Sequence, residues 1–448
     1  MKARNRAKLL VDGHRILPPL LRDLRAARRN IHVSIFLFFR DPIGLELADV
    51  LAERARAGVR VRVLLNMTKT AMGDPFSTGE KRMMKHDPNV QYDPLDIEPL
   101  CEALTQAGVE VIDTDIDYDR VIQVHDPRLV AIAARIREAI DVDVLHIDHR
   151  KLIVIDGNVA YVGGANIGAQ YLFHEAYDPE LDARVEGQQR KLNGQEEPWW
   201  KWHDSLTRFQ GPIVHEIDQE FYARWLLDGG QHFQLEPPLE LAHVAATDSA
   251  VAGDEIESAK IYLNAPDGQP NAVRELYVRL ITSAERSIFI ENPYLYHPAI
   301  VDALCAARAK RPELSVVLVL PSEKHNDNSF AQDAQQHNYP RLLAAGVEIY
   351  EYLNHFNHLK LAVFDERFSI HGSTNLNYRS LEDDKDFELV VCIDDRAFAA
   401  QNLREVRDVD VRHALRYTDR EVTGLSWAAL RVRVRHPWTQ LMQWRRVL

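Results

Sequence analysis

The feature that most constrains this chain is a short motif that occurs twice. Both copies read H-x-K-x4-D, and their six residues are His149, Lys151, Asp156, His358, Lys360 and Asp365. In each copy an Asn follows the His by 17 residues and ends a turn that contains Gly, at Asn166 and at Asn375. A single copy arises by chance in about a few per cent of chains of this length. Two copies with the same Asn interval indicate an internal duplication.

The spacing inside the motif predicts a strand. Because side chains alternate between the two faces of a strand, His149 and Lys151 project the same way, while Ile153 and Ile155 continue that face as apolar residues. We therefore expect a buried strand that brings an imidazole and an ammonium group to the edge of a sheet. Such a cationic corner, with an Asn amide as a further donor, is suited to the oxygens of a phosphate group.

The residues that surround the motif resemble a known family. The chain is similar to members of the phospholipase D superfamily, whose signature is this motif present twice, and it looks most like the bacterial cardiolipin synthase branch. The resemblance runs from about Ala7 to about Phe398. Other stretches that carry it are Leu-Leu-Val-Asp-Gly at 9–13, Gly-Val-Arg-Val-Arg-Val-Leu from Gly58, Gly-Val-Glu-Ile-Tyr-Glu-Tyr from Gly346, 375–380, and Asp386-Phe387-Glu388.

The expected fold class is α/β. Apolar periodicity predicts a helix over 14–29, a strand over 31–39, a helix from Ile43 that closes at Gly58, and a strand over 59–65. Strand, helix and strand in this order indicate a parallel crossover. The resemblance implies two phospholipase D-like domains related by a pseudo-twofold axis. Each would be a mixed, largely parallel sheet flanked by helices, and the two would share one active site.

The two halves align with offsets that shrink along the chain, which places the insertions and the boundary. The offset is 257 residues between the Ile at the start of each first strand and 209 residues between the two motifs. The first domain is expected over 1–240, the linker over 241–257 and the second domain over 258–400, followed by a basic segment rich in Trp and Arg over 401–448. Insertions are expected near 70–92, 115–143 and 173–201.

Bulk properties limit the functional classes. The 448 residues are 46% hydrophobic, which suffices for two cores, and the net charge of −13 disfavours a dedicated nucleic-acid binder. The three cysteines form no disulfide or metal-binding pattern. No apolar run approaches the length of a membrane span, and the N-terminus lacks the core of a signal peptide. We expect a cytoplasmic protein that is peripheral on the inner membrane.

The resemblance implies a mechanism for the two motifs acting together. One imidazole attacks phosphorus and forms a phosphohistidine, while the other protonates the departing oxygen and later deprotonates the incoming alcohol or water. We assign His149 as the nucleophile and His358 as the acid and base, although pseudo-symmetry leaves these roles exchangeable. Lys151, Lys360, Asn166 and Asn375 would bind the non-bridging phosphate oxygens. The scheme requires no metal and no cofactor.

In the family a carboxylate downstream of each motif orients the imidazole. The matching positions are Asp204, in Trp-His-Asp, and Glu388. Glu175 and Asp178 are alternatives to Asp204. The family commonly has Asn two residues before the Glu, and Asp386 stands there in this chain. Asp156 and Asp365 lie at the far end of the motif strand, where we expect a structural role.

Two neighbouring histidines and two Trp-rich stretches allow more than one interpretation. His146 and His355 each precede a motif His by three residues, and without the Lys and Asp of the motif they are interpreted as structural. Three Trp beside Lys in 196–202 are typical of an interfacial lid or of aromatic packing over a loop. The basic ends of the chain suit an anionic membrane surface or solvated helix faces.

Three functions remain open on the sequence. The first is phosphatidyl transfer to an alcohol, with cardiolipin made from phosphatidylglycerol. The second is hydrolysis by a phospholipase D-type enzyme, phosphodiesterase or nuclease of the same fold. The third is a lipid-binding scaffold without catalysis, which two intact motifs disfavour. The expected substrate is a phospholipid, and the expected state is a monomer with internal pseudo-twofold symmetry.

Overall fold

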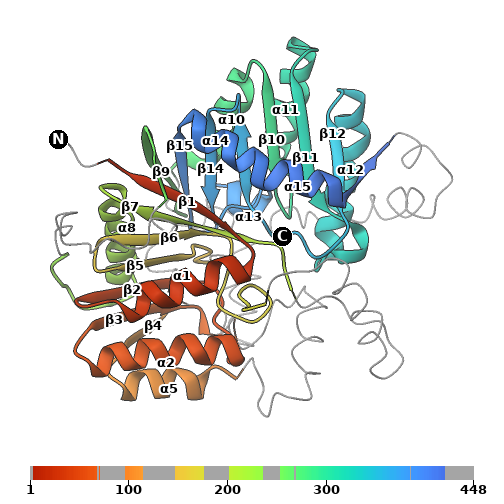
Figure 1. Ribbon diagram of the computed structural model, residues 1–448. Helices are drawn as coiled ribbons and strands as arrows, with labels where there is room; N and C mark the ends of the chain where they lie inside the picture. The colour runs from red at the N-terminus through yellow and green to blue at the C-terminus, as the bar shows by residue number, and fades with distance from the viewer. Residues whose placement is uncertain are drawn as a thin grey trace, which may run out of the picture. The chain divides into compact units, whose positions relative to one another are not determined.

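The computed structural model describes residues 4–67, 70, 96–114, 147–175, 201–235, 253–266, 269–383 and 385–418. These residues form two compact units, each built on an eight-stranded sheet (Figure 1). Unit 1 takes the described residues within 1–117, 148–261 and 371–373, and unit 2 takes Ile147, 262–370 and 374–418.

The sheet of unit 1 combines three parallel strands with five antiparallel ones. Its strands, in spatial order, are β4 (Glu110–Asp113), β3 (Arg60–Leu65), β2 (Asn30–Ile35), β5 (Leu152–Ile155), β6 (Val159–Gly163), β7 (Ser205–Gln210), β1 (Arg6–Val11) and β8 (Asp254–Glu255). β2, β3 and β4 pair in parallel, and every pairing from β2–β5 onward to β8 is antiparallel.

The sheet of unit 2 repeats this order. Its strands are β16 (Ala414–Tyr417), β12 (Glu348–Tyr352), β11 (Ser315–Pro321), β10 (Ser287–Glu291), β13 (Leu361–Phe364), β14 (Phe368–Gly372), β15 (Glu388–Asp394) and β9 (Ser258–Asn264). From β12 to β9 these strands correspond one by one to those from β4 to β1. β10, β11 and β12 are parallel, whereas β10–β13 and β12–β16 are antiparallel.

The mixed α/β fold expected from the sequence is confirmed, with one correction to the strand directions. The sheets are not largely parallel, because only two of the seven strand pairings in unit 1 are parallel, and in unit 2 the parallel pairs β10–β11 and β11–β12 are flanked on both sides by antiparallel pairs. Consecutive parallel strands have a helix between them in the chain, as is usual for a parallel crossover. Each motif strand is joined to the next strand by a turn of three residues, from β5 to β6 and from β13 to β14, and so short a connection produces an antiparallel pair.

A row of three helices packs against the sheet of each unit. In unit 1 the row is α1 (Gly13–Arg25), α2 (Pro42–Arg56) and α5 (Glu98–Gln106), and in unit 2 it is α10 (Ala272–Ser283), α11 (Pro298–Lys310) and α12 (Ser329–Ala344). A further helix of unit 1, α8 (Ile213–Leu227), packs against β2, β5, β6 and β7. Within the described ranges, no helix has both the length and the apolar composition to cross a bilayer.

The remaining short elements of unit 2 are η3 (Glu323–His325), α13 (Tyr378–Leu381), α14 (Arg396–Asn402), η4 (Leu403–Arg407), α15 (Asp408–Asp410) and η5 (Val411–His413). Since β16 joins the second sheet, the chain belongs to unit 2 up to at least Tyr417.

The core of unit 2 lies between its helical row and its sheet. It is made of apolar side chains from α10, α11 and the strands, such as Leu280, Ile300 and Val316. The expected insertions over 70–92, 115–143 and 173–201 lie wholly or mostly outside the described residues, as do residues 241–252 of the expected linker and the Trp-rich part of 401–448. The expected domain limits therefore stay predictions.

Candidate functional site

Each motif His and Lys lies immediately before a strand rather than inside it. β5 begins at Leu152, after Lys151, and β13 begins at Leu361, after Lys360. The side chains of this segment bond to its own backbone. Lys151 Nζ donates to the carbonyl oxygen of His149 at 2.7 Å, and Lys360 Nζ donates to that of His358 at 2.8 Å. The side chains of Asp148 and Asn357 also bond to nearby backbone N–H groups, and such local bonds from Asp and Asn compete with the ladder of a sheet.

Both lysines are buried, and Lys360 lies close to its motif imidazole. Lys151 is 2% exposed and Lys360 is 3% exposed. Lys360 Nζ also lies 3.1 Å from Nδ1 of His358, and because an ammonium group is only a donor, the ring nitrogen accepts. A buried ammonium beside an imidazole is an arrangement suited to an anionic group that both can contact.

An aromatic ring packs against each motif His. The ring of Phe36, which follows β2, meets the ring of His149 edge-on with a centroid separation of 5.2 Å, and Lys151 Nζ lies 5.1 Å from the centroid of Phe36. In unit 2 the rings of Phe356 and His358 have centroids 5.6 Å apart. These rings limit the space in which the two imidazoles can move.

The Asn of the first copy is held by the segment that follows β2. Asn166 is 2% exposed, and its Oδ1 accepts the backbone N–H of Leu37 at 3.1 Å. With its oxygen engaged, the amide has its NH2 group as the donating end. Asp41 supports the same loop, since its carboxylate accepts from Ala169 N at 2.6 Å and from Gly44 N, at the start of α2, at 2.8 Å. Burial raises the pKa of Asp41 above its usual value, against the effect of these N–H donors.

The Asn of the second copy lies in a similar loop with different supports. Asn292 Nδ2 donates to Thr374 O at 3.1 Å, and its Oδ1 accepts from Leu376 N at 3.0 Å. The N–H of Asn375 donates to Ser380 Oγ at 3.2 Å, and the hydroxyl of Ser380 donates to Glu388 Oε1 at 2.5 Å. Glu388 is therefore connected to Asn375 through one serine. The sequence interpretation did not identify this role of Ser380, although it lies within the family-like stretch 375–380.

The first candidate orienting carboxylate is fully buried. Asp204 is 0% exposed, and its Oδ1 accepts from the backbone N–H of Ser205 at 2.7 Å. A Cβ atom on Gly164 would lie 2.3 Å from Asp204 Oδ1, so only glycine permits this close approach. Asp204 is thus packed against the turn that carries Asn166. Of its alternatives, Glu175 is exposed and Asp178 lies outside the described residues.

The last residue of each motif bonds to backbone. Asp156 accepts from the N–H groups of Arg28, Arg29 and Asn30 at 2.7–3.0 Å. Asp365 accepts from the N–H groups of three consecutive residues, Glu285, Arg286 and Ser287, at 2.7–3.1 Å. These hydrogen bonds tie the far end of each motif strand to the start of β2 or β10. His355 is buried, whereas His146 lies outside the described residues.

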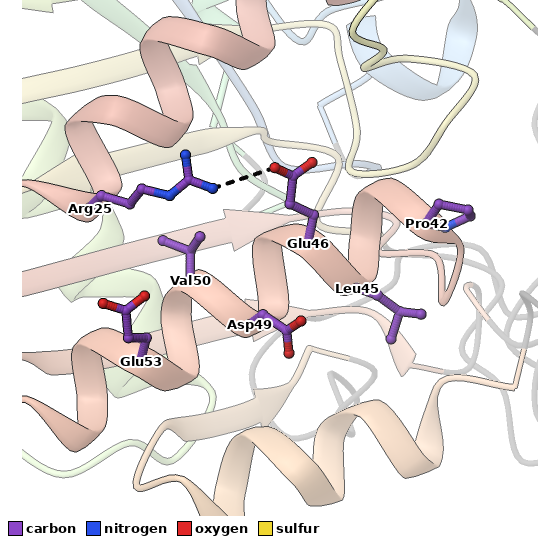
Figure 2. A pocket seen from close by; sticks show the side chains of 7 residues that line it. All are labelled: Arg25, Pro42, Leu45, Glu46, Asp49, Val50 and Glu53. Atoms are coloured by element: carbon purple, nitrogen blue, oxygen red, sulfur yellow. Dashed lines mark hydrogen bonds and ion pairs between the residues drawn. The ribbon is translucent and has the colours of Figure 1, made fainter.

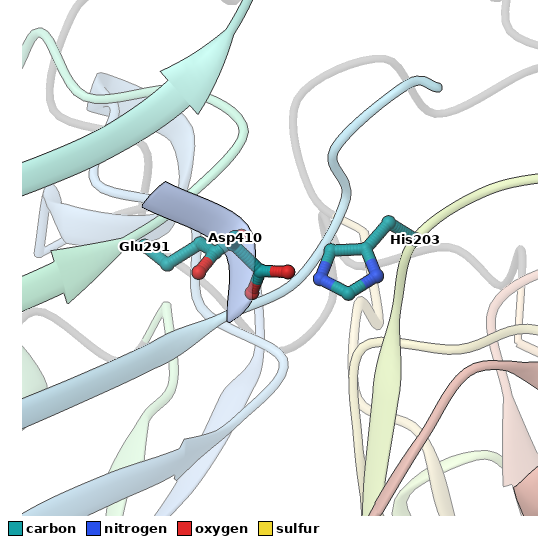
Figure 3. Close-up of side chains that lie close together, drawn as sticks. All are labelled: His203, Glu291 and Asp410. Carbon is teal, nitrogen blue, oxygen red and sulfur yellow. The ribbon is translucent and has the colours of Figure 1, made fainter. Parts of the chain in front are cut away.

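Figure 3 draws three further buried side chains, His203 of unit 1 and Glu291 and Asp410 of unit 2. His203 Nδ1 lies 2.8 Å from Asp12 Oδ1 in its own unit. In unit 2, Asn357 Nδ2 donates to Glu291 Oε1 at 2.7 Å. His203 and Glu291 thus each have a hydrogen-bond partner within their own unit.

A cavity of about 410 Å³ lies beside α2 (Figure 2). Its lining residues are Arg25, Pro42, Leu45, Glu46, Asp49, Val50 and Glu53. Arg25 Nη2 lies 3.4 Å from Glu46 Oε1 at its wall. The lining contains three carboxylates and no motif residue, so this cavity is separate from the candidate site and unsuited to an anionic group.

Comparison with known proteins connects these residues to one group. The model of a family described as the phospholipase D-like domain of cardiolipin synthase matches residues 20–199 and 277–409, which include both motifs. The chain is 28% identical to a cardiolipin synthase of Geobacillus kaustophilus over 83% of its length and 60% of that protein. It is 26% identical to the major cardiolipin synthase ClsA of Bacillus subtilis over 84% of its length and 63% of that protein. The chain thus spans about three fifths of these relatives.

A solved structure shares the fold. The crystal structure of phosphatidylserine synthase from Haemophilus influenzae Rd KW20 superposes with a TM-score of 0.62 at 13% identity, covering 99% of this chain and 95% of that one. At this identity the likeness establishes the fold alone.

Proposed function

Because the chain belongs to the family described as the phospholipase D-like domain of cardiolipin synthase, we propose that it transfers a phosphatidyl group from one lipid to the hydroxyl group of another. The proposed reaction joins two molecules of phosphatidylglycerol and yields cardiolipin and glycerol. The observation that supports it best is that each unit presents a motif imidazole with its buried lysine bonded to the carbonyl of the same His.

The proposed chemistry has two steps. In the first, the imidazole of His149 attacks phosphorus, and the bond between phosphorus and the oxygen of the glycerol headgroup breaks. His358 gives a proton to that oxygen. In the second, the hydroxyl of the acceptor lipid loses its proton to His358 and attacks phosphorus, and the bond between phosphorus and His149 breaks. The proton returns to His358, so one turnover consumes two phospholipids and leaves the protein unchanged.

The polar groups around the imidazoles have distinct proposed roles. Lys151, Lys360, Asn166 and Asn375 bind the non-bridging oxygens, where negative charge increases in the transition state. The burial of both lysines supports this role, since an ammonium group interacts more strongly with an anion where water is excluded. Asp204 and Glu388 orient the two imidazoles, and their complete burial is consistent with contacts to protein groups.

The substrate determines the proposed location. A lipid with two acyl chains is presented at a membrane surface, so the protein works as a peripheral protein on an anionic bilayer, as a monomer that carries both motifs. We place it on the cytoplasmic side of the inner membrane.

The reaction is tested by product analysis. Purified protein is incubated with phosphatidylglycerol vesicles in the presence of a chelator, and the lipids are identified by mass spectrometry. We expect cardiolipin and glycerol in equal amounts, and a loss of at least about a thousandfold in both His149→Ala and His358→Ala. Phosphatidic acid as the sole lipid product would instead establish hydrolysis. An absence of any lipid product would contradict the proposal, and single-stranded DNA would then be the next substrate to test.

The assignment of the nucleophile needs a separate experiment. A phosphatidyl ester of p-nitrophenol has a leaving group that departs without a proton, so His358→Ala should still form the covalent intermediate. After acid-free denaturation and digestion, mass spectrometry should find the phosphatidyl group on the peptide that contains His149. A modified His358 peptide in the reciprocal His149→Ala variant, with none in His358→Ala, would reverse the two roles.

A further inference from the structure

The residue before each motif His forms the same small turn in both units. In unit 1, Asp148 Oδ1 accepts the backbone N–H of Arg150 at 3.1 Å. In unit 2, Asn357 Oδ1 accepts the backbone N–H of Leu359 at 3.2 Å. A side-chain oxygen that accepts the N–H two residues later makes an Asx turn. His149 and His358 each occupy the middle of such a turn.

The turn of unit 1 is fixed by buried charges. Arg150 donates to Asp148 through two nitrogens, Nε to Oδ1 at 2.9 Å and Nη2 to Oδ2 at 2.8 Å. Arg224, on α8, lies with its Nε 3.2 Å from Asp148 Oδ2 and donates to Asp228 at 2.6 Å. All four side chains are at most 5% exposed. The segment around His149 is therefore clamped to the C-terminal end of α8.

The turn of unit 2 is fixed by a neutral amide and a carboxylate. Asn357 is 0% exposed, and its Nδ2 donates to Glu291 Oε1 at 2.7 Å. Strand pairing shows which residue corresponds to Glu291 in unit 1. Leu361 is paired with Glu291, and its counterpart Leu152 is paired with Ser34. Ser34 of unit 1 thus stands where unit 2 has the strand residue Glu291. The carboxylate of unit 1 is in the turn itself, at Asp148, and its partners are arginines.

We propose that Asp148 and Asn357 are positioning residues that hold the two motif imidazoles through their Asx turns. The feature common to both units is the side-chain oxygen at the position before the His, and the partners that fix it differ. The geometry explains why the pair Asp and Arg in one copy can correspond to Asn and Leu in the other. This inference rests on the proposed function only for its kinetic readout.

Exchange of residue types between the copies gives a matched test. The double variant Asp148→Asn/Arg150→Leu gives unit 1 the Asn-His-Leu triplet of unit 2 and leaves Arg224 with Asp228 as a partner. The double variant Asp148→Ala/Arg150→Leu differs from it only in the loss of the side-chain amide, so it cannot form the turn. Comparison within this pair cancels the effect of removing the buried arginine.

The kinetic readout separates positioning from folding. We expect Asp148→Asn/Arg150→Leu to keep kcat for lipid transfer within about fivefold of the wild type, and the Ala-containing variant to lose a further ten- to hundredfold in kcat with little change in KM. Thermal unfolding is measured on both. Equal kcat values for the two variants would overturn the proposal, as would a loss of activity that follows the unfolded fraction alone.

A second readout does not depend on the lipid reaction. With 15N-labelled histidine, the ring resonances of His149 are identified by their absence in His149→Ala. We expect one set of signals in the wild type and in the Asn-containing variant, and broadened or multiple signals in the Ala-containing variant. Identical His149 signals in the two double variants would overturn the proposal. A wild type without transfer activity would count against the proposed function alone, because this readout would still decide the role of the turn.

Unit 2 provides an independent comparison. Asn357→Ala removes the turn beside His358, and Asp395→Ala removes a buried side chain whose Oδ1 accepts from Phe398 N at 2.8 Å at the start of α14. Both variants lose a buried side-chain oxygen that accepts a backbone N–H in the same unit. We expect a loss of kcat of at least tenfold in Asn357→Ala and none in Asp395→Ala among the folded molecules. Equal effects on kcat would show that Asn357 acts only through stability.

Discussion

At the scale of single residues, Asp156 and Asp365 make equivalent hydrogen bonds. Both have positive φ values, each 53°, and both accept from three consecutive backbone N–H groups at the start of a neighbouring strand. A second bond repeats as well, since the side chains of Arg29 and Arg286 each donate to the carbonyl oxygen of the respective Asp at 2.5 Å. Each Asp therefore connects the end of its motif strand to the start of a neighbouring strand, β2 for Asp156 and β10 for Asp365.

Replacement of these aspartates should reduce stability. Asp156→Ala leaves three N–H groups without their acceptor and places Ala at positive φ, so we expect a loss of about 3 kcal/mol in the free energy of unfolding. Asp365 is more exposed than Asp156, and water can replace part of its bonding, so Asp365→Ala should lose less. Urea unfolding measures both. An unchanged stability together with lost transfer activity would contradict this role and place the carboxylate in the chemistry.

The motif residues could be predicted from the sequence because their types and spacing repeat. Asp148 and Arg150 could not, since their counterparts are Asn357 and Leu359 and no pattern of residue types is shared. The partner Arg224 lies more than 70 residues away on α8, and the link to Asp148 exists only in the folded unit. The turn itself is a feature of hydrogen bonding that two different residue types satisfy.

At the scale of elements, three helices of the two rows end at a glycine with positive φ. α2 is followed by Gly58 with φ of 90°, α5 by Gly108 with φ of 92°, and α12 by Gly346 with φ of 83°. A left-handed residue just after a helix satisfies its last carbonyl groups, and glycine adopts this conformation without steric cost. The expected closure of the second helix at Gly58 is confirmed.

The same substitution should have different effects at two of these positions. A Cβ atom on Gly58 would meet nothing within 4 Å, whereas one on Gly346 would lie 2.3 Å from Arg308 Nη2. Gly58→Ala should therefore cost only the strain of positive φ, about 1 kcal/mol. Gly346→Ala should cost more, because it also displaces the guanidinium that donates to the carbonyls of Ala345 and Leu314. Equal unfolding midpoints for the two variants would contradict this account.

The end of α8 should make stability depend on pH. Burial raises the pKa of Asp228 from 3.8 to about 7, and the attraction of Arg224 offsets only part of this effect. Between pH values of about 4 and 7 the folded state therefore holds a proton that the unfolded state has released, so this contribution to stability is present at low pH and is lost as pH rises. The stability of the wild type relative to Asp228→Asn should fall across this window. A difference in thermal midpoint that stays constant with pH would contradict the prediction.

The order of the elements was predictable, and their directions were less so. Apolar periodicity located α1, β2, α2 and β3 to within a few residues. It could not give the direction of the strands after the motif, because a buried strand has the same apolar pattern in parallel and antiparallel pairs. β5 also begins later than expected, after the segment in which Asp148 accepts the backbone N–H of Arg150.

At the scale of the whole molecule, the chain consists of one structural plan used twice. Among the described residues, seven strands and three helices of unit 1 have counterparts in the same order in unit 2, and the additional strands are the edge strands β8 and β16, on opposite sides of the repeated set. The repeated plan explains why equivalent bonds recur at the two motifs. The differences between the copies, such as Ser34 against Glu291, show where each unit was adjusted separately.

Duplication within one chain leads to a final prediction about complementation. Since each chain carries both motifs, the proposed reaction needs only one molecule. A chain in which one imidazole is replaced cannot complete the reaction, and a second chain does not supply the missing group. An equimolar mixture of His149→Ala and His358→Ala should therefore form no more cardiolipin than the two variants do separately, with the double variant His149→Ala/His358→Ala as the baseline. The assay is the same vesicle reaction, followed over a range of protein concentrations because any recovery through association would increase with concentration. Recovery towards a quarter or more of the wild-type rate would show instead that imidazoles from two chains act on one phosphate, and the single chain would then not be the catalytic unit.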